Sequence, residues 1–155
     1  FSVMSDKENA IHVEEWVNEA VGDGAKVLFG GKRKEAYYEP TIITNTKKQM
    51  KVCALEIFGP VVTIEKYKKF EDAIHEINDS EYGLQAGVFT NAINEMNHAF
   101  NELEVGGVIM NDVPTFRVDH MPYGGIKNSG FGREGLKYSI FEMLEPKLLV
   151  KNNNY

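Results

Sequence analysis

The stretch that decides the fold is GVFTNAINEMNHAFNELEVGGVIMN, residues 87–111. It begins with a short, strand-like run at 87–90 and ends with another at 108–111. Between the two runs, apolar residues recur with the spacing of one helix face: Ile93, Met96, Phe100 and Leu103. A strand, a helix and a strand with short connections predict a βαβ unit, in which the two strands are parallel.

The residues before this stretch predict more alternation of the same kind. A second helix is indicated by the spacing of Phe70, Ala73, Ile74 and Ile77. Three extended pieces precede it at 26–29, 40–44 and 60–64, and the third is our candidate for a central strand. A first helix is expected from Ser5 as N-cap, with Glu8 three residues on, to the glycines at 22 and 24.

The residues after the stretch are irregular at first. Residues 112–135 are rich in Gly, Pro and Asn, and Leu136, Ile140 and Leu144 then indicate a last helix. A closing strand at 146–150 and a polar tail at 151–155 are expected to follow. We therefore predict one α/β unit with a single core and a mostly parallel sheet with flanking helices.

The composition argues against several function classes. The 155 residues carry a net charge of −6, whereas a dedicated nucleic-acid or anionic-membrane binder needs clustered Lys and Arg. The one dense basic run, 66–69, lies among acidic residues and is interpreted as a solvated face. A single cysteine allows no internal disulfide, and no apolar run approaches the ~20 residues of a membrane span. We expect a cytoplasmic protein.

The residues 130–135, GFGREG, match the dinucleotide-binding pattern G-x-G-x-x-G. That fingerprint needs a buried strand before it and an acidic residue about 20 positions after it. Here loop-type residues precede the glycines and a polar tail lies at the later position. The favoured interpretation is a tight loop that needs positive φ or close backbone packing, and a stand-alone dinucleotide module is kept as an alternative.

Other reactive side chains give weak signals. Cys53 has apolar neighbours and no local base, so we expect a buried or half-buried bystander. The histidines show no metal-binding spacing, and three of them are expected on solvated helix faces: His12, His75 and His98. His120 falls in the loop run Arg117–His120, for which a structural salt bridge and a functional site are equally good interpretations.

Three stretches go further than composition. LEIFGPVV (55–62), GLQAGVFT (83–90) and MPYGGIKNSGFGREG (121–135) resemble, in this order, the C-terminal motifs of the NAD(P)-dependent aldehyde dehydrogenase superfamily. The similarity covers essentially the whole chain. NDVPTFRVDHMPYGG (111–125) is similar to the subgroup that oxidises small hydroxy- or anion-bearing aldehydes, such as lactaldehyde, glyceraldehyde and succinate semialdehyde.

The resemblance implies an enzyme that oxidises an aldehyde to an acid through a cysteine thiolate. It places that cysteine, the oxyanion-hole asparagine, the general base and the nucleotide-binding fold upstream, so Cys53 is not the nucleophile. The chain opens with FSVM, without an initiator Met, and we expect a fragment that is inactive alone, with no catalytic residue and no tightly bound cofactor. The alternative is a non-catalytic interaction or oligomerisation domain derived from that family.

The cofactor residues carry over by motif. Glu56 matches the glutamate that in this family hydrogen-bonds the two hydroxyls of the nicotinamide ribose, and a carboxylate can accept from both. Phe58 matches the aromatic residue near the nicotinamide ring. The family often has an acidic residue before the glutamate, where this chain has Leu55. The resemblance leaves NAD and NADP undecided.

The substrate and structural residues follow in the last third of the chain. Arg117 lies on the loop that lines the aldehyde tunnel in the family, and we hypothesise that it selects an anionic or hydroxylated substrate tail, with Phe116 in the tunnel wall. The alternative is a structural arginine paired with Asp119. The structural motif is represented by Asn111 at a strand end and by the loop residues Gly125, Lys127, Gly130 and Gly132.

The resemblance also implies a division of the chain and an assembly. Residues 1–145 are expected to form the C-terminal part of the catalytic domain, and residues 146–155 an oligomerisation strand and tail. That strand is expected to extend the sheet of a neighbouring subunit in a homodimer or tetramer. Besides an aldehyde and the rest of its own enzyme, no nucleic acid, membrane or metal is expected as a partner.

Overall fold

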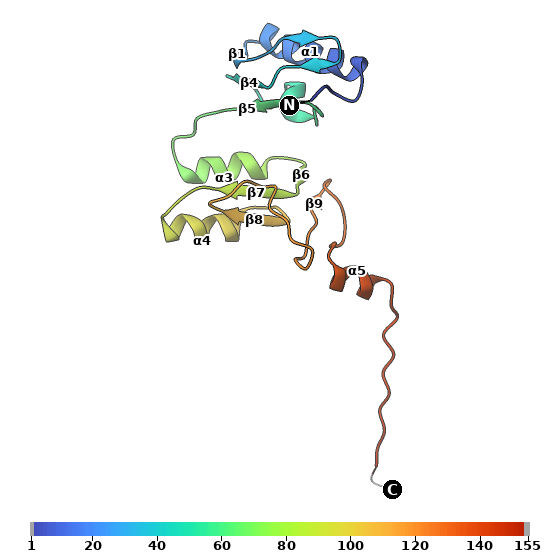
Figure 1. The fold of residues 1–155 in the computed structure, drawn as a ribbon. Coiled ribbons are helices and arrows are strands. Elements are labelled where there is room, and N and C mark those ends of the chain that lie inside the picture. The colour runs from blue at the N-terminus through green and yellow to red at the C-terminus, as the bar shows by residue number, and fades with distance from the viewer. Residues whose placement is uncertain (1, 154–155) are drawn as a thin grey trace. The chain divides into compact units, whose positions relative to one another are not determined.

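The computed structural model describes residues 2–153 and divides into two compact units, Phe1–Tyr67 and Lys68–Tyr155 (Figure 1). Each unit has its own hydrophobic core. The prediction of a single core is therefore wrong. The elements alternate between helix and strand as the sequence indicates, but Lys68 begins a second set of packing contacts that sequence periodicity does not reveal.

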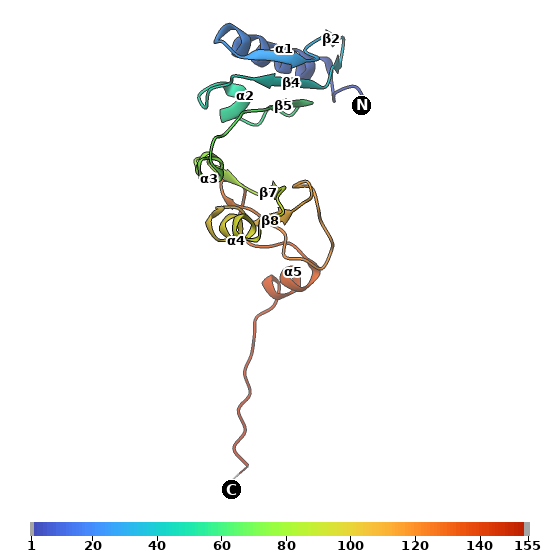
Figure 2. The ribbon, with the colours of Figure 1, turned by 90° about the vertical axis from the view of Figure 1, so that its left-hand side faces the viewer.

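The first unit is built around one long helix, α1 (Lys7–Gly22). Its N-cap is Asp6, whose side chain accepts a hydrogen bond from the backbone N–H of Asn9 at 2.7 Å. The expected cap, Ser5, lies one residue too early and instead accepts from the side chain of Asn9. Figure 2 shows α1 lying along the sheet of this unit.

That sheet has the order β1-β4-β5 and combines two pairings. Strand β1 (Lys26–Phe29) is antiparallel to β4 (Thr41–Thr44), and β4 is parallel to β5 (Val61–Thr63). The central strand is β4 and β5 is at the edge, contrary to the prediction for residues 60–64. A two-residue hairpin, β2 (Arg33–Lys34) with β3 (Tyr37–Tyr38), and the one-turn helix α2 (Lys51–Ala54) complete the unit.

The core of the first unit lies between α1 and β4. Val13 and Val17 on the helix and Ile43 on the strand are each at most 2% exposed. Tyr38 from β3 is also buried, at 1% exposure. These are the largest fully buried side chains of the described residues, and they hold the helix on the sheet by removing apolar surface from water.

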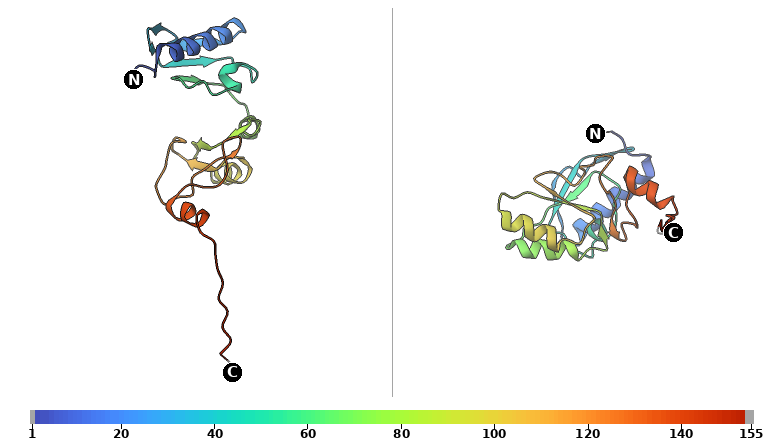
Figure 3. Two further views of the ribbon diagram at one scale, coloured as in Figure 1. Left: turned by 90° about the vertical axis from the view of Figure 1, so that its right-hand side faces the viewer. Right: turned by 90° about the horizontal axis from the view of Figure 1, so that it is seen from below.

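The second unit contains the predicted βαβ arrangement. Helix α3 (Phe70–Asn78) precedes β7 (Gln85–Val88), and α4 (Ile93–Glu102) connects β7 to the parallel strand β8 (Gly107–Met110). Both helices contribute to one core, with Ile74 of α3 and Ala99 of α4 packed with Ala86 and Val88 of β7. Figure 2 shows both helices on the same side of the strand pair, and Figure 3 gives two further views of them.

The rest of the second unit has little regular structure. Strand β6 (Tyr82–Gly83) pairs antiparallel with β9 (Ile126–Lys127), and α5 (Leu136–Glu142) is the last helix. Residues 143–153 form no strand, so the expected closing strand at 146–150 has no partner within residues 2–153. Leu148, Leu149 and Val150 are 80–88% exposed. Residues 154 and 155 of the predicted tail lie outside the described residues.

The fold class is α/β, as predicted, but the sheets are small and mixed. Within residues 2–153, two strand pairs are parallel and three are antiparallel, so the sheet is not mostly parallel. The predicted boundary between residues 145 and 146 stays a prediction. In the described part of the chain, no helix is both long and apolar enough to cross a membrane.

Candidate functional site

The residues predicted to bind ligands fall into two groups, one in each unit. Glu56 and Phe58 belong to the first unit, and Phe116 and Arg117 to the second. The two groups are described separately below.

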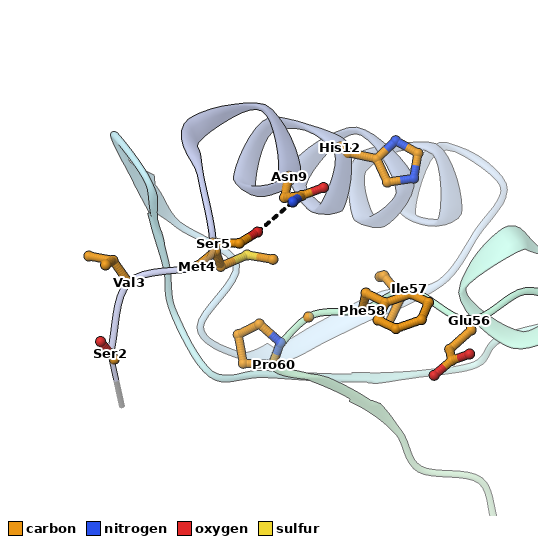
Figure 4. A pocket seen from close by; sticks show the side chains of 11 residues that line it. Ser2, Val3, Met4, Ser5, Asn9, His12, Glu56, Ile57, Phe58 and Pro60 are labelled. Atoms are coloured by element: carbon orange, nitrogen blue, oxygen red, sulfur yellow. Dashed lines mark hydrogen bonds between the residues drawn. The ribbon is translucent and has the colours of Figure 1, made fainter.

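The first group lines a hollow of about 580 Å³ in the first unit. One wall is the start of α1 with Asn9 and His12, and the other is the segment 56–60; residues 2–5 complete the lining. Figure 4 shows Asn9 and His12 on the helix, with Glu56, Phe58 and Pro60 on the segment that passes beneath it in this view.

Close packing of a glycine brings this segment to the helix. A methyl group on Gly59 would lie 2.6 Å from a side-chain methyl of Val13, so only glycine lets the segment lie this close to α1. Phe58 has a positive φ of 46°, and Pro60 accepts a backbone hydrogen bond from Thr41 of β4 at 2.8 Å. Because residues 9, 12 and 13 share one side of the helix, the segment lies beside Asn9 and His12.

The hollow offers the chemistry that a ribose and an aromatic ring need. The Glu56 carboxylate is exposed and, among residues 2–153, has neither a hydrogen-bond nor an ion-pair partner. It is therefore free to accept hydrogen bonds from two neighbouring hydroxyls. The Phe58 ring is 77% exposed, an unusual state for a large apolar side chain, and offers a flat face to a ligand.

Sequence reasoning missed Asn9 and His12 as site residues. It placed His12 on a solvated helix face, and the side chain is indeed exposed on α1. The three-residue spacing puts the two side chains on one face of a helix. No local signal indicates that the segment 56–60 lies opposite that face.

Cys53 does not behave as expected. It is exposed on α2, so the prediction of a buried or half-buried bystander is wrong. The helix is a single surface turn whose buried residue is Val52, which leaves the next side chain in solvent. Its thiol has no hydrogen-bond partner in the described residues, so no base is placed to take its proton.

The second group lies on the loop that follows β8. The loop begins at Asn111, which has a positive φ of 58°. Its side-chain oxygen accepts a hydrogen bond from the backbone N–H of Thr90 at 2.9 Å, and its own N–H donates to Val88 at 2.7 Å. Asn111 thus ties the start of the loop to the end of β7. Phe116, further along, is 48% exposed.

Arg117 is held by two residues that face each other across the loop. Its guanidinium donates to the Glu134 carboxylate at 2.7 Å and lies 4.3 Å from the centre of the Tyr123 ring. Tyr123 and Glu134 exchange backbone hydrogen bonds of 3.0 and 2.6 Å. The structural partner is therefore Glu134 rather than Asp119. The Arg117 side chain remains 48% exposed, which leaves guanidinium donors open to solvent.

The fingerprint-like glycines form turns. Gly130, Gly132 and Gly135 have φ values of 133°, 70° and 116°, a region that other residues rarely adopt. Gly125 is needed for close packing, because a methyl group there would lie 2.4 Å from the Ser129 side chain. The strand before these glycines, β9, is antiparallel to β6 and is not the first strand of a βαβ unit. The context for pyrophosphate binding is therefore missing.

Lys127 joins three parts of the second unit. Its ammonium donates to the backbone carbonyls of Asn78 at 2.7 Å and Ser80 at 3.2 Å, and forms an ion pair with Glu104 at 2.6 Å. The first two contacts satisfy carbonyls at the C-terminal end of α3. The histidines at 75 and 98 lie on α3 and α4, and His120 is exposed on the loop. Within residues 2–153 no group of His, Cys, Asp or Glu is arranged to hold a metal ion.

Comparisons with known proteins agree on one family. The family model described as "Aldehyde dehydrogenase family" matches residues 2–149. The 3-sulfolactaldehyde dehydrogenase of Priestia megaterium is 54% identical over 145 residues, which are 94% of this chain and 30% of that protein. The lactaldehyde dehydrogenase of Methanococcus aeolicus is 44% identical over 151 residues, 97% of this chain and 32% of that protein.

Solved structures give the same result. Aldehyde dehydrogenase 21 from Physcomitrella patens, in complex with succinate, superimposes with a TM-score of 0.94 at 49% identity, over 98% of this chain and 32% of that chain. The glyceraldehyde-3-phosphate dehydrogenase GapN from Methanocaldococcus jannaschii, complexed with NADP, has a TM-score of 0.84 at 43% identity, over 89% and 30%. The chain spans about a third of the length of the relatives it matches.

Proposed function

This chain belongs to the aldehyde dehydrogenase family, and we propose that it supplies the C-terminal part of an enzyme that oxidises a small aldehyde with NAD or NADP. The observation that carries the proposal is the hollow in which the unpaired Glu56 carboxylate and the exposed Phe58 ring lie opposite α1. When bound, NAD(P) accepts the hydride of the aldehyde, and water supplies the second oxygen of the acid. The cysteine nucleophile lies outside these 155 residues.

The residues of the hollow divide the work of holding the cofactor. Glu56 accepts hydrogen bonds from the two hydroxyls of the nicotinamide ribose. Phe58 packs against the nicotinamide ring, and its positive φ sets the direction of the side chain. Asn9 and His12 line the opposite wall and contact the same cofactor. Relatives solved with NADP and with NAD⁺ are both among the matches, so either dinucleotide suits the family.

Cofactor binding tests the first part of the proposal. In the full-length protein that contains this chain, Glu56→Gln should raise the Kd for NAD(P) about tenfold, because two charge-assisted hydrogen bonds are weakened. Glu15→Gln, at an exposed carboxylate of α1 away from the hollow, is the matched control and should leave Kd unchanged. Equal Kd values for Glu56→Gln and the unaltered protein would contradict the proposed site.

The location of the nucleophile is tested with the chain alone. The 155-residue chain should form no reduced nicotinamide from NAD(P) and an aldehyde, because Cys53 has no activating partner in the described residues. Turnover by this chain that disappears in Cys53→Ser would place the nucleophile within it and overturn this part of the proposal.

The second group of residues is assigned to the substrate. We propose that Arg117 recognises an anionic or hydroxylated tail of the aldehyde and that Phe116 forms part of the tunnel wall. The guanidinium is held by Glu134 and Tyr123 but still has donors exposed, which suits a carboxylate or sulfonate ligand. Relatives named for sulfolactaldehyde and a neighbour solved with succinate support an anionic substrate.

Substrate kinetics test the assignment of Arg117. In the full-length protein, Arg117→Ala should raise KM for an anionic aldehyde such as succinate semialdehyde about tenfold or more. KM for a neutral aldehyde such as lactaldehyde should change far less. Asp119→Asn, two residues along the same loop, is the control and should change neither value. Similar increases for both aldehydes in Arg117→Ala would exclude selection by charge.

A further role concerns assembly. We propose that residues 146–150 pair with a sheet of a neighbouring subunit, because Leu148, Leu149 and Val150 are 80–88% exposed and form no strand within the described chain. Leu149→Lys should lower the oligomeric state of the full-length protein in light scattering. An unchanged oligomer would contradict the pairing.

A further inference from the structure

One face of the β7–β8 pair is almost without side chains. The register places Gln85 opposite Gly107 and Gly87 opposite Ile109, and these four residues share one face. We call it the glycine face. The opposite face carries Ala86, Val88, Val108 and Met110, which pack into the core of the second unit.

The loop that carries Arg117 lies on the glycine face. A methyl group on Gly87 would lie 2.6 Å from the backbone oxygen of Asp112 and 3.1 Å from the ring of Pro114. Contacts that short show that the loop backbone lies directly on β7, with no room for any side chain at position 87.

Gln85 is the one polar side chain of this face, and it reaches the loop. Its amide nitrogen donates a hydrogen bond of 3.4 Å to the backbone oxygen of Phe116, the residue before Arg117. The opposite glycine gives it room: a methyl group on Gly107 would lie 3.2 Å from that nitrogen and 3.3 Å from Cγ of Gln85. Gln85 therefore lies flat across Gly107 and holds the loop one residue before the guanidinium-bearing position.

We propose that Gln85 is a positioning residue for substrate selection, acting through Arg117. The inference rests on the proposed function of Arg117 as the reader of an anionic tail. Glu134 and Tyr123 hold the guanidinium, and Gln85 holds the backbone next to it. A guanidinium recognises an anion well only when its place is fixed in advance, so both supports are needed.

The experiment removes the donor and keeps the volume. In the full-length protein, Gln85→Met should raise KM for succinate semialdehyde about fivefold, because one hydrogen bond to the loop is lost. KM for lactaldehyde, and kcat for both aldehydes, should stay within about twofold. Gln49→Met, at an exposed glutamine of the first unit, is the matched control and should change none of these values.

A second variant tests the same geometry from below. Gly107→Ala places a methyl group under the flat Gln85 side chain and should give the same split between the two aldehydes. In an Arg117→Ala background, Gln85→Met should have no further effect on KM for succinate semialdehyde, because the two residues act as one unit. Equal changes for both aldehydes, or no change for either in both variants, would overturn the inference.

The outcomes separate the two proposals. If Arg117→Ala discriminates between the aldehydes and neither Gln85→Met nor Gly107→Ala does, the role of Gln85 fails alone. If Arg117→Ala fails to discriminate, the proposed function of Arg117 fails, and the role of Gln85 fails with it. Thermal unfolding of each variant, measured beside the kinetics, shows whether it is folded.

Discussion

The two units hold their site residues by different means. In the first unit, the segment with Glu56 lies against α1, and the core beneath contains the large buried side chains Tyr38 and Ile43. In the second unit, the loop with Arg117 lies on the glycine face and is fixed by hydrogen bonds and an ion pair. The second core is formed mainly by smaller residues, among them Ala86 and Ala99.

This difference indicates which kind of change each site tolerates. A segment held over a large apolar core depends on the volume of distant buried side chains, because their burial supplies the free energy that keeps the helix and sheet together. A loop that lies on bare backbone depends instead on the absence of single methyl groups and on individual polar contacts. The first site should fail through loss of stability and the second through loss of selectivity.

The largest expected effect comes from the first core. Ile43 is 0% exposed, so Ile43→Ala should lower the free energy of unfolding by about 2–5 kcal/mol through lost burial and an unfilled cavity. Trp16 packs against this core and is the single tryptophan, so its fluorescence during denaturant unfolding of the 155-residue chain reports on the first unit.

A surface substitution in the same sheet provides the control. Val62, on β5, is 54% exposed, and Val62→Ala should shift the transition by less than about 1 kcal/mol. Hydrogen exchange at Val88 should be unaffected by either change, since it belongs to the other core. If Ile43→Ala also opened Val88 to exchange, the two cores would not be independent.

Helix periodicity was the most successful signal in the sequence. The apolar spacing that predicted helices around Val13, Ile74 and Ala99 corresponds to α1, α3 and α4, because each helix buries one stripe of side chains. The position of the first N-cap was wrong by one residue. Ser5 and Asp6 are both good capping residues, and the short bond from Asp6 to Asn9 decides between them only in three dimensions.

The features that sequence could not predict depend on distant contacts. Two cores instead of one, and an edge rather than a central position for β5, follow from which strands pair, and no local pattern encodes that choice. Arg117 was recognised by its loop, but its partner Glu134 lies 17 residues away. Asn9 and His12 were missed because the segment that faces them is more than 40 residues later in the chain.

A change of intermediate size tests the glycine face. Gly87→Ala adds a methyl group 2.6 Å from the Asp112 carbonyl, so the loop must move away from β7. We expect a loss of about 1–3 kcal/mol in stability of the second unit, as in other overpacked sites. Hydrogen exchange at the Thr90 amide, which donates to Asn111 at the start of the loop, provides the local measurement.

The control for this change is a glycine with open space around it. A methyl group on Gly22, at the end of α1, would meet nothing within 4 Å, so Gly22→Ala should be neutral or slightly stabilising. Equal effects of the two substitutions would show that the loop does not depend on the bare surface at Gly87, and the contrast between the units would be lost.

The smallest effect should come from the buried phenol of the first core. Tyr38 is 1% exposed and its hydroxyl has no hydrogen-bond partner in the described chain, so Tyr38→Phe should change stability at pH 7 by less than about 1 kcal/mol. Burial raises the pKa of the Tyr38 phenol above its ordinary value, and the nearby carboxylates of Glu14 and Glu39 act in the same direction.

A raised pKa in the folded state fixes the sign of the pH dependence. The contribution is complete below the unfolded value of about 10 and is lost as the pH rises above it, because the unfolded chain then releases its proton first. The unaltered protein should therefore lose stability above about pH 10 relative to Tyr38→Phe, whose phenyl ring does not titrate. Denaturant midpoints followed by Trp16 fluorescence measure both proteins, and parallel curves through this range would mean that Tyr38 reaches water in the first unit.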